Sequence, residues 1–301
     1  MQLQRFQNYF FVLPALAIAL ALVSIFVWGL KPGIDLIGGS LLEVEYTQGV
    51  PPIEVIQEKV NALGYGEVRI QPSGENDLMF RQKALSESEK TTLDETLASF
   101  GLMKEIQYTS IGPSIGAELI KKAWWAISLI SILTILFIAF AFRHVSKPVS
   151  AWKYGIVAII TLLHDILIPI GLFAYLGHAR GAETGVLFIV ALLTILGISI
   201  NDTIVVFDRI RENLSRNEKK GKHETFKDVV WRSISQTLAR SVNTSVTVII
   251  MLVALFIFGP ESTKDFSLTL IVGMVAGTYS SIFLASPMLL LIEKWQGKSN
   301  K

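Results

Sequence analysis

The stretch that decides the fold is Thr194-Ile-Leu-Gly-Ile-Ser-Ile-Asn-Asp-Thr-Ile-Val-Val-Phe-Asp-Arg-Ile-Arg-Glu-Asn213. It begins as an apolar run with a single acid, Asp202, and turns ionic from Asp208 onward. The apolar run, from about 185 to 207, is long enough to cross a bilayer as a helix. A carboxyl group inside such a helix costs about 2.5–3.5 kcal/mol on insertion scales, so it usually faces a partner in the bundle interior. Asp202 is therefore the first candidate functional residue; the alternative is a structural, hydrogen-bonded carboxyl.

Other polar side chains lie close to Asp202 in the sequence. Ser199, three residues earlier, shares its helical face, and Asn201 and Thr203 flank it. Together they form a polar patch in an otherwise apolar segment, and we treat them as supporting residues.

The composition points to a membrane protein. The chain has 301 residues, of which 51% are hydrophobic and 17% charged, against about 25% charged residues in soluble domains. It has no cysteine, which excludes disulfides, thiolate catalysis and cysteine-bound metals. The net charge of +2 says little by itself.

The first part of the chain predicts one span followed by a soluble insertion. Residues 1–30 comprise a short polar start and a first, uncleaved membrane helix, because no cleavage site follows the apolar run. Residues 31–121 then alternate between strand and helix patterns, in the order β-α-β-β-α-β of the ferredoxin-like fold. The predicted elements are strands at 41–46, 66–71, 78–82 and 104–109, and helices at 52–63 and 86–100. Ser86 and Glu89 have the spacing of a capping box at the start of the second helix.

The rest of the chain, residues 122–301, predicts a membrane domain of five helices. The apolar stretches are 123–142, 152–176, 185–207, 241–258 and 266–292. With the first span they make six transmembrane helices, so the fold class is a polytopic α-helical membrane protein with an inserted α+β domain between helices 1 and 2.

The basic residues of the short loops predict the orientation. On one side of the membrane lie Arg143, Lys147, Lys153, Arg209, Arg211, Arg216, Lys219, Lys220, Lys222, Lys227, Arg232, Lys294, Lys298 and Lys301. The opposite short loops carry only Arg180 and Lys264. We therefore expect both termini in the cytoplasm and the soluble domain outside it.

The basic loop at 208–240 also contains an apolar stripe at helical spacing. Its residues are Phe226, Val229, Val230, Ile234 and Leu238, preceded by Thr225 and Asp228 in cap positions. This pattern predicts an amphipathic helix on the cytoplasmic face of the membrane.

Three further features lie inside the predicted spans. Arg240 stands where the basic loop passes into a span, followed on the same face by Asn243 and Thr244; the alternative for it is an arginine reaching the lipid phosphates. His164 and Asp165 lie in mid-span and either transfer protons or only hydrogen-bond neighbouring helices. A stripe of small residues, Gly273, Gly277, Ser281 and Ala285, indicates close helix packing.

At this point the chain resembles the SecF family, the smaller membrane subunits of the SecD–SecF complex of bacterial protein export. The resemblance covers nearly the whole chain and rests on four stretches: Gly33-Ile-Asp-Leu-Ile-Gly-Gly39, His164-Asp165, the stretch from Ser199 to Asn213, and Gln236-Thr-Leu-Ala-Arg-Ser-Val-Asn-Thr-Ser245. Leu36 departs from the phenylalanine common in the family, which leaves the resemblance intact.

The resemblance implies more than the residue patterns do. It implies half of an RND-like transporter, completed by SecD and working with the SecYEG channel on preproteins in the bacterial inner membrane. Asp202 would be the proton-accepting carboxyl and Arg240 its nearby cation, with His164 and Asp165 in the same relay. Gly33, Asp35, Gly38 and Gly39 would form the hinge to the outer domain. The proton gradient would be the energy source, with no cofactor, metal or nucleic acid.

Two other functions use the same residues. A proton-coupled exporter of small molecules or lipids also needs an intramembrane acid. Against this function, a single small outer domain offers too little structure for a substrate-binding porter. An intramembrane hydrolase could use His164, Asp165 and Ser199, but no hydrolase motif accompanies them. We therefore expect a transport protein and not an enzyme.

Overall fold

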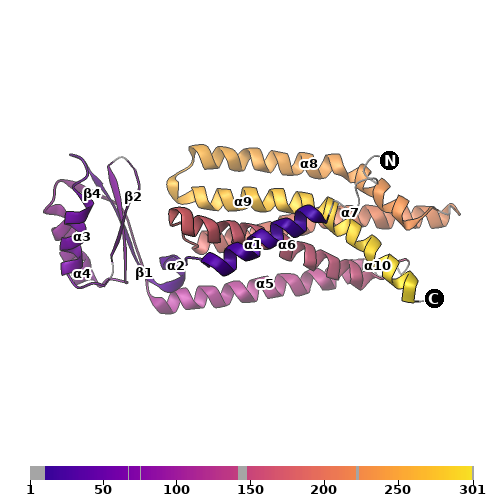
Figure 1. The fold of residues 1–301 in the computed structure, drawn as a ribbon, viewed down its shortest axis with the longest axis horizontal. Coiled ribbons are helices and arrows are strands. Elements are labelled where there is room, and N and C mark those ends of the chain that lie inside the picture. Colours follow the sequence, from indigo (N-terminus) through magenta and orange to yellow (C-terminus); the bar gives the residue numbers. More distant parts are fainter. Residues whose placement is uncertain (1–10, 67, 75, 142–147, 222–223, 300–301) are drawn as a thin grey trace. The chain divides into compact units, whose positions relative to one another are not determined.

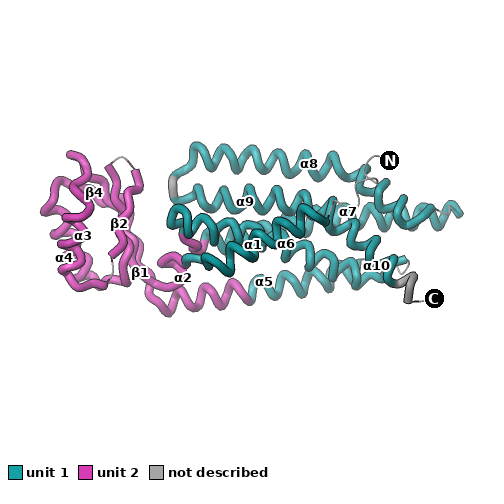
Figure 2. Tube along the Cα trace, in the orientation of Figure 1, with its two compact units in different colours: residues 1–31, 125–182, 187–301 teal, residues 32–124, 183–186 magenta. Residues whose placement is uncertain are grey.

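The computed structural model describes residues 11–66, 68–74, 76–141, 148–221 and 224–299, which form two compact units (Figures 1 and 2). The helical unit comprises residues 1–31, 125–182 and 187–301, and the sheet unit comprises 32–124 and 183–186. The basic residues Arg143, Lys147 and Lys222, used above to predict orientation, lie outside the described residues, as does Lys301.

The sheet unit is an antiparallel sheet with three helices, α2, α3 and α4, and the first turns of α5 in the described part of its sequence. Its strands run in the order β2-β3-β1-β4, and every pairing is antiparallel. The elements are α2 (Ile34–Ile37), β1 (Gly39–Tyr46), α3 (Ile53–Ala62), β2 (Arg69–Pro72), β3 (Asp77–Gln82), α4 (Glu87–Ala98) and β4 (Met103–Ile111). The strands and the helices α3 and α4 lie within a few residues of their predicted places, whereas α2 was not predicted.

One face of this sheet packs against α3 and α4. Leu42, Val44 and Phe80 alternate with less buried neighbours along β1 and β3 and are inaccessible to solvent. Ile56 and Val60 of α3, four residues apart, complete this core together with Leu93 and Leu97 of α4. The Tyr46 hydroxyl donates to the Leu97 carbonyl at 3.3 Å, and burial raises the pKa of Tyr46 to about 12.

The predicted capping box is confirmed at the start of α4. The Ser86 hydroxyl accepts from the Glu89 backbone N–H, and the Glu89 carboxylate accepts from the Ser86 backbone N–H at 2.8 Å. These bonds satisfy two backbone donors that a helix otherwise leaves free. The hydrogen bonds from Ser86, with one from Lys83, lower the pKa of Glu89 to about 2.

The isolated sheet, residues 39–111, is expected to unfold cooperatively and to lose stability as the pH falls from about 4.5 to about 2. Because the folded state lowers the pKa of Glu89, ionised Glu89 stabilises it above the unfolded pKa, and protonation removes that contribution. Glu89→Gln should flatten the pH dependence of thermal unfolding, whereas Glu87→Gln, in the same helical turn, should keep it. A disordered fragment, or equal pH curves, would contradict this.

The helical unit is built of helices, most of them long and apolar. They are α1 (Val12–Trp28), α5 (Pro113–Ala141, which begins in the sheet unit), α6 (Ala151–Arg180), α7 (Val186–Lys219), α8 (Phe226–Phe258), α9 (Glu261–Ser280), η2 (Ser281–Ala285) and α10 (Ser286–Ser299). Five segments are long and apolar enough to span a membrane: α5, α6, α7, α8 and the continuous run of α9, η2 and α10. The first predicted span corresponds to α1, a mostly apolar helix of 17 residues in the described part of the chain.

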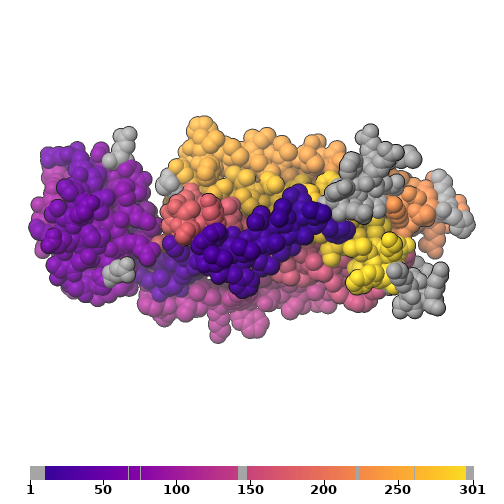
Figure 3. Space-filling model, viewed as in Figure 1, coloured from indigo at the N-terminus to yellow at the C-terminus, as the bar shows by residue number. Residues whose placement is uncertain are grey.

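Helix α1 lies on the outside of the helical unit (Figure 3). Val12 and Phe26 are 58% and 84% exposed. Its contact with α6 is close because Gly171 has no side chain: a Cβ there would lie 2.3 Å from the Ala21 Cα. Apolar side chains exposed on a helix of this kind suit a lipid environment.

Gly171→Ala is expected to lower the thermal stability of the detergent-solubilised protein. The added methyl group would meet the Ala21 backbone, and such overpacking typically costs about 1–3 kcal/mol. Gly197→Ala is the matched control, since a Cβ at Gly197 meets nothing within 4 Å. Equal unfolding temperatures for the two variants would show that α1 is not held by this contact.

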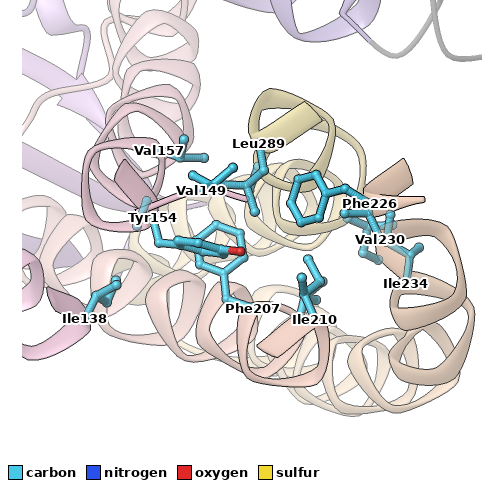
Figure 4. Packing of buried hydrophobic residues seen from close by; sticks show 14 of the residues in the cluster. Ile138, Val149, Tyr154, Val157, Phe207, Ile210, Phe226, Val230, Ile234 and Leu289 are labelled. Atoms are coloured by element: carbon cyan, nitrogen blue, oxygen red, sulfur yellow. The ribbon is translucent and has the colours of Figure 1, made fainter. Parts of the chain in front are cut away.

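The region 208–240 differs from its prediction as an amphipathic loop. Helix α7 continues to Lys219, and α8 runs without a break from Phe226 through the predicted start of the span at 241. The apolar stripe is buried: Phe226, Val230 and Ile234 pack into one cluster with Phe207 and Ile210 of α7 (Figure 4). The stripe therefore serves packing within the helical unit, because the extended α7 supplies apolar partners for it.

The last predicted span contains an irregularity. Between α9 and α10, residues Ser281–Ala285 form a π-helix, η2. The small-residue stripe runs through it: a Cβ at Gly273 would lie 2.2 Å from Ile195, and Ser281 and Ala285 are fully buried. These contacts agree with the predicted packing role. Single π-turns often occur at functional sites, and this one begins beside α7, where the Ser281 and Thr203 hydroxyls lie 3.0 Å apart.

Candidate functional site

Asp202 lies among hydroxyl groups contributed by two other helices. Its side chain is on α7, and the residue is 7% exposed. Its Oδ2 accepts a long hydrogen bond, 3.5 Å, from the Ser245 hydroxyl on α8. Thr278 on α9 in turn donates to Ser245 Oγ at 2.6 Å. In the described part of the chain no cation lies within 4 Å of the Asp202 carboxylate.

A second buried carboxyl, Asp165, lies on α6. Its Oδ1 is 2.8 Å from His164 Nδ1, and its Oδ2 accepts a short hydrogen bond from the Ser199 hydroxyl on α7. His164 and Asp165 are 2% and 0% exposed. His164 Nε2 is buried and has no hydrogen-bond partner among the described residues. The His164 ring therefore has one nitrogen, Nε2, available for a proton or a ligand.

The two carboxyl sites meet at one narrow pocket. Ser199 and Asp202 both line it, and the Ser199 hydroxyl is bound to Asp165. The other lining residues are Ile195, Ile198, Gly273, Met274, Gly277 and Thr278. A Cβ at Gly277 would lie 3.1 Å from the Ser199 Cβ and 3.6 Å from Asp165 Oδ2, so a glycine here lets α9 close over the site. The pocket has essentially no space for a water molecule.

The predicted supporting residues separate into two groups. Ser199 and Thr203 are buried, and each hydrogen-bonds a side chain of another helix. Asn201, Asn243 and Thr244 are exposed on the helical unit and do not line the pocket. They are polar side chains on the outer surface of helices that otherwise suit lipid, which makes that surface unusual.

Arg240 is also exposed, at the point on α8 where the basic segment meets the apolar one. It forms no ion pair within 4 Å with Asp202 in the part of the chain that the structure describes. Arg240 is thus a cation on the helix that also carries Ser245, and among the described residues it is not paired with the acid.

Two residues of the site were not singled out from the sequence. Ser245 and Thr278 are the hydroxyl groups next to Asp202. A signal for Ser245 existed, because Ser241 and Ser245 are four residues apart and both are buried. Thr278 follows Gly277 of the small-residue stripe, but nothing in the sequence places it against α8.

The predicted hinge residues belong to the sheet unit. Gly38 and Gly39 have φ angles of +83° and +152°, which L-residues rarely adopt. The Asp35 carboxylate accepts from the Val186 backbone N–H at 3.1 Å, and Gly33 donates its N–H to the Thr184 carbonyl at 2.8 Å. These four residues thus form a structured segment held by specific contacts.

Comparison with known proteins covers the chain nearly from end to end. Residues 92–295 match the family "Protein export membrane protein SecD/SecF, C-terminal", and residues 23–50 match the "SecD/SecF GG Motif". The protein translocase subunit SecF of Thermobaculum terrenum is 41% identical over 98% of this chain and 93% of its own length. SecF of Synechocystis is 35% identical over 93% of this chain and 91% of its own length.

Longer relatives contain a region similar to this chain. SecDF of Bacillus subtilis is 32% identical over 98% of this chain and 38% of its own length. The crystal structure of SecDF from Thermus thermophilus, described as a translocon-associated membrane protein, superposes with a TM-score of 0.82 at 31% identity, and this chain spans 39% of it. A SecDF structure in a super-membrane-facing form gives a TM-score of 0.65. The chain therefore belongs to the SecF family of protein translocase subunits, multi-pass membrane proteins of the Sec protein-export pathway.

Proposed function

We propose that this chain is the SecF half of a complex that uses proton movement through its membrane helices to promote the export of preproteins through the SecYEG channel. Asp202 is the proton-accepting carboxyl. The observation that carries the proposal is a buried carboxyl surrounded by hydroxyl groups, with no cation within 4 Å in the described residues. Such a carboxyl can exist in either protonation state at modest cost, because hydroxyls donate or accept.

The neighbouring carboxyl extends the route for a proton. His164, Asp165 and Ser199 form a hydrogen-bonded chain that ends at the wall of the Asp202 pocket. In this proposal His164 Nε2 exchanges a proton on one side, and the Ser199 hydroxyl relays it toward Asp202. The pocket has no room for a chain of water molecules in the conformation described, so proton transfer between the two carboxyl groups waits for a conformational change.

The energy available to such a change is limited. One elementary charge that crosses 100 mV releases about 2.3 kcal/mol. That is enough to shift a two-state equilibrium about fifty-fold, since 1.4 kcal/mol is a factor of ten. Several protons per cycle, or protons carried also by a second half, are then required to move a preprotein segment.

The membrane topology follows from the same proposal. Helix α1 is the first of six spans, and the sheet unit is an extracytoplasmic domain of the ferredoxin-like class, which its strand order β2-β3-β1-β4 supports. Both termini lie in the cytoplasm of a bacterium. The described basic residues agree: Arg209, Arg211 and Arg216 follow α7's apolar part, whereas Arg180 at the opposite end is paired with Asp265 at 2.5 Å.

SecD is the partner that completes the transporter core. Arg240, Asn201, Asn243 and Thr244 are exposed on the helical unit although they lie on apolar helices. Lipid tails cannot hydrogen-bond them, so a second protein half is expected to cover this face. The fused SecDF relatives, in which a matching region makes up about two fifths of the chain, supply such a half covalently.

Two other functions are less well supported. A proton-coupled exporter of small molecules or lipids would use the same acid, but the pocket beside Asp202 has no room for a substrate. A hydrolase of the Ser-His-Asp type needs its histidine between the nucleophile and the acid. Here Asp165 stands between His164 and Ser199, so Ser199 is not activated as a nucleophile. We therefore propose a transport role without enzymatic activity, cofactor, metal or nucleic acid.

The test uses inverted membrane vesicles that contain SecYEG and SecD. Adding this chain should increase translocation of a preprotein only when a proton gradient is present, and a protonophore should remove the increase. Affinity purification from mildly solubilised membranes should recover SecD. Full stimulation in vesicles without SecD would contradict the half-transporter proposal, and stimulation unaffected by the protonophore would contradict the proton-driven mechanism.

A further inference from the structure

Two segments far apart in the sequence are joined within the sheet unit, and we call them together the clamp. One is Pro32–Gly39, which contains α2, and the other is Glu183–Val186, which precedes and opens α7. Gly33 donates its backbone N–H to the Thr184 carbonyl at 2.8 Å, and Pro32 and Thr184 form a parallel β-bridge. Both segments therefore belong to the same compact body as the sheet.

Asp35 holds the start of α7. Its Oδ2 accepts the backbone N–H of Val186, the first residue of that helix, at 3.1 Å. This N–H has no partner inside the helix, and a carboxylate is favoured at a helix N-terminus. A Cβ at Gly185 would lie 2.6 Å from the same Asp35 oxygen. A side chain at position 185 would therefore displace the carboxylate from its present place at the start of the helix.

The clamp is also fixed to the sheet and to a second membrane helix. Arg81 of β3 lies 3.4 Å from the Glu183 carboxylate, and both side chains are at most 20% exposed. A Cβ at Gly38 would lie 2.7 Å from the Pro113 backbone at the start of α5. A Cβ at Gly116, one turn into α5, would lie 2.4 Å from the Leu36 carbonyl. One short motif thus touches the first turns of both α5 and α7.

Helix α7 leads from the clamp to the acid. Asp202 lies 16 residues after Val186, which is about 24 Å along a continuous helix. From Leu187 onward that helix belongs to the helical unit. A helix whose first residue is held by one body and whose middle carries a buried acid can transmit a displacement in either direction.

We infer that residues Glu183–Val186 move with the sheet unit as one body throughout the cycle, and that Asp35 is the positioning residue that couples this body to Asp202 through α7. This inference rests on the proposed function, because it takes Asp202 as the site of proton uptake. It changes the role of the motif: the glycines allow close contact with the starts of α5 and α7, and the segment is a fixed connection, not a free hinge.

The first test removes the connection in the complete complex. In inverted vesicles with SecD and SecYEG, Asp35→Ala should reduce proton-stimulated export about tenfold, with normal assembly and with Asp202-dependent proton uptake retained. Gly185→Ala should act in the same way, since its methyl group would displace the carboxylate. Ser86→Ala is the control, because it removes a helix cap from the same unit without touching α7; it should export normally. Normal export in Asp35→Ala would overturn the inference.

The second test locks the connection. The chain has no cysteine, so Pro32→Cys with Thr184→Cys introduces a single possible disulfide between bridge partners. The oxidised complex should export as well as the reduced one, because the clamp stays closed. Export that stops on oxidation and returns on reduction would show that the clamp opens, which would overturn the inference.

A third measurement separates failure of this inference from failure of the proposed function. Amide hydrogen exchange at the start of α7 should be faster in Asp35→Ala than in the unaltered complex, whether or not export depends on protons. Unchanged protection would overturn the inference even if proton-driven export were established. If amide exchange at the start of α7 is faster in Asp35→Ala but export by the unaltered complex does not depend on the proton gradient, the clamp is retained and the proton-driven mechanism is rejected.

Discussion

Asp202→Asn is expected to abolish the stimulation of export by the proton gradient while the amount of assembled complex stays normal. The amide has the shape of the carboxyl but cannot gain or lose a proton, so the site is fixed near its neutral state. The neighbouring groups tolerate the change, because the Ser245 hydroxyl can donate to an amide oxygen as it donates to the carboxylate. Loss of function would then come from the missing titration.

A structural role for Asp202 predicts the opposite result. A carboxyl that only hydrogen-bonds Ser245 is replaced well by an amide, and Asp202→Asn would be nearly silent. Asp202→Glu gives a graded test: the carboxyl remains but is one methylene longer, in a pocket with no spare room, so partial function is expected. If Asp202 titrates, export should be highest in the wild type, lower in Asp202→Glu and lowest in Asp202→Asn. If Asp202 serves only packing, Asp202→Asn should export nearly as well as the wild type.

The matched control is Asp208→Asn, the same substitution six residues further along α7. Asp208 is 55% exposed and pairs with Arg211 at 2.8 Å, an arrangement that contributes about 0–1 kcal/mol. It should export normally. Export is measured with and without a gradient in inverted vesicles, beside the quantity of complex recovered. Wild-type stimulation in Asp202→Asn would end the proton-relay proposal, and reduced assembly would return Asp202 to a structural role.

The elements of the sheet unit were predictable because they depend on local patterns. The alternation along β1 and the capping box at Ser86 are determined by neighbours in sequence, and the structure has both. The register between β1, β3 and β4 was not predictable, since no local signal states which residues pair across a sheet. Helix α2 was missed because its four residues, Ile34–Ile37, are too few to show a helical pattern. It lies against the first turn of α5, where a Cβ at Gly116 would be 2.4 Å from the Leu36 carbonyl oxygen.

The ends of the membrane helices were less predictable. Hydropathy marks the part of a helix that suits a bilayer, not the point where its backbone hydrogen bonds end. Helices α7 and α8 therefore extend well beyond the apolar runs, to Lys219 and back to Phe226. The π-helix at Ser281–Ala285 also escapes sequence reasoning, because it depends on how α9 packs against its neighbours.

The same distinction holds for the site. Asp202, His164 and Asp165 were identified because a charged or titratable group in an apolar run is a strong local signal. Ser245 and Thr278 were not, because their importance lies in contacts between α7, α8 and α9. Arg240 was expected beside Asp202, and the structure leaves it exposed on α8 without an ion pair to that acid in the described residues.

Arg240→Ala is expected to be as damaging to proton-driven export as Asp202→Asn, again with normal assembly. Arg240 is a cation on α8, the helix that also carries Ser245, the hydrogen-bond donor to Asp202, and a low dielectric strengthens the interaction between two charges. If the cation approaches the carboxylate in one state of the cycle and leaves it in another, its position decides whether Asp202 holds a proton. Removing it leaves the acid without the group that makes protonation depend on conformation.

Three further variants test whether Arg240 and Asp202 act together. Arg240→Lys keeps the positive charge but replaces the planar guanidinium, which has five hydrogen-bond donors, with a compact ammonium group. It should therefore also lose most of the coupling between the proton gradient and export. Arg232→Ala, eight residues earlier on α8, removes an arginine paired with Glu224 at 2.6 Å and should export almost normally. The double variant Asp202→Asn with Arg240→Ala should be no worse than either single variant, because residues that act as one unit are not additive. If the two losses instead multiply, Arg240 acts independently of Asp202, and the exposed arginine serves only the partner interface.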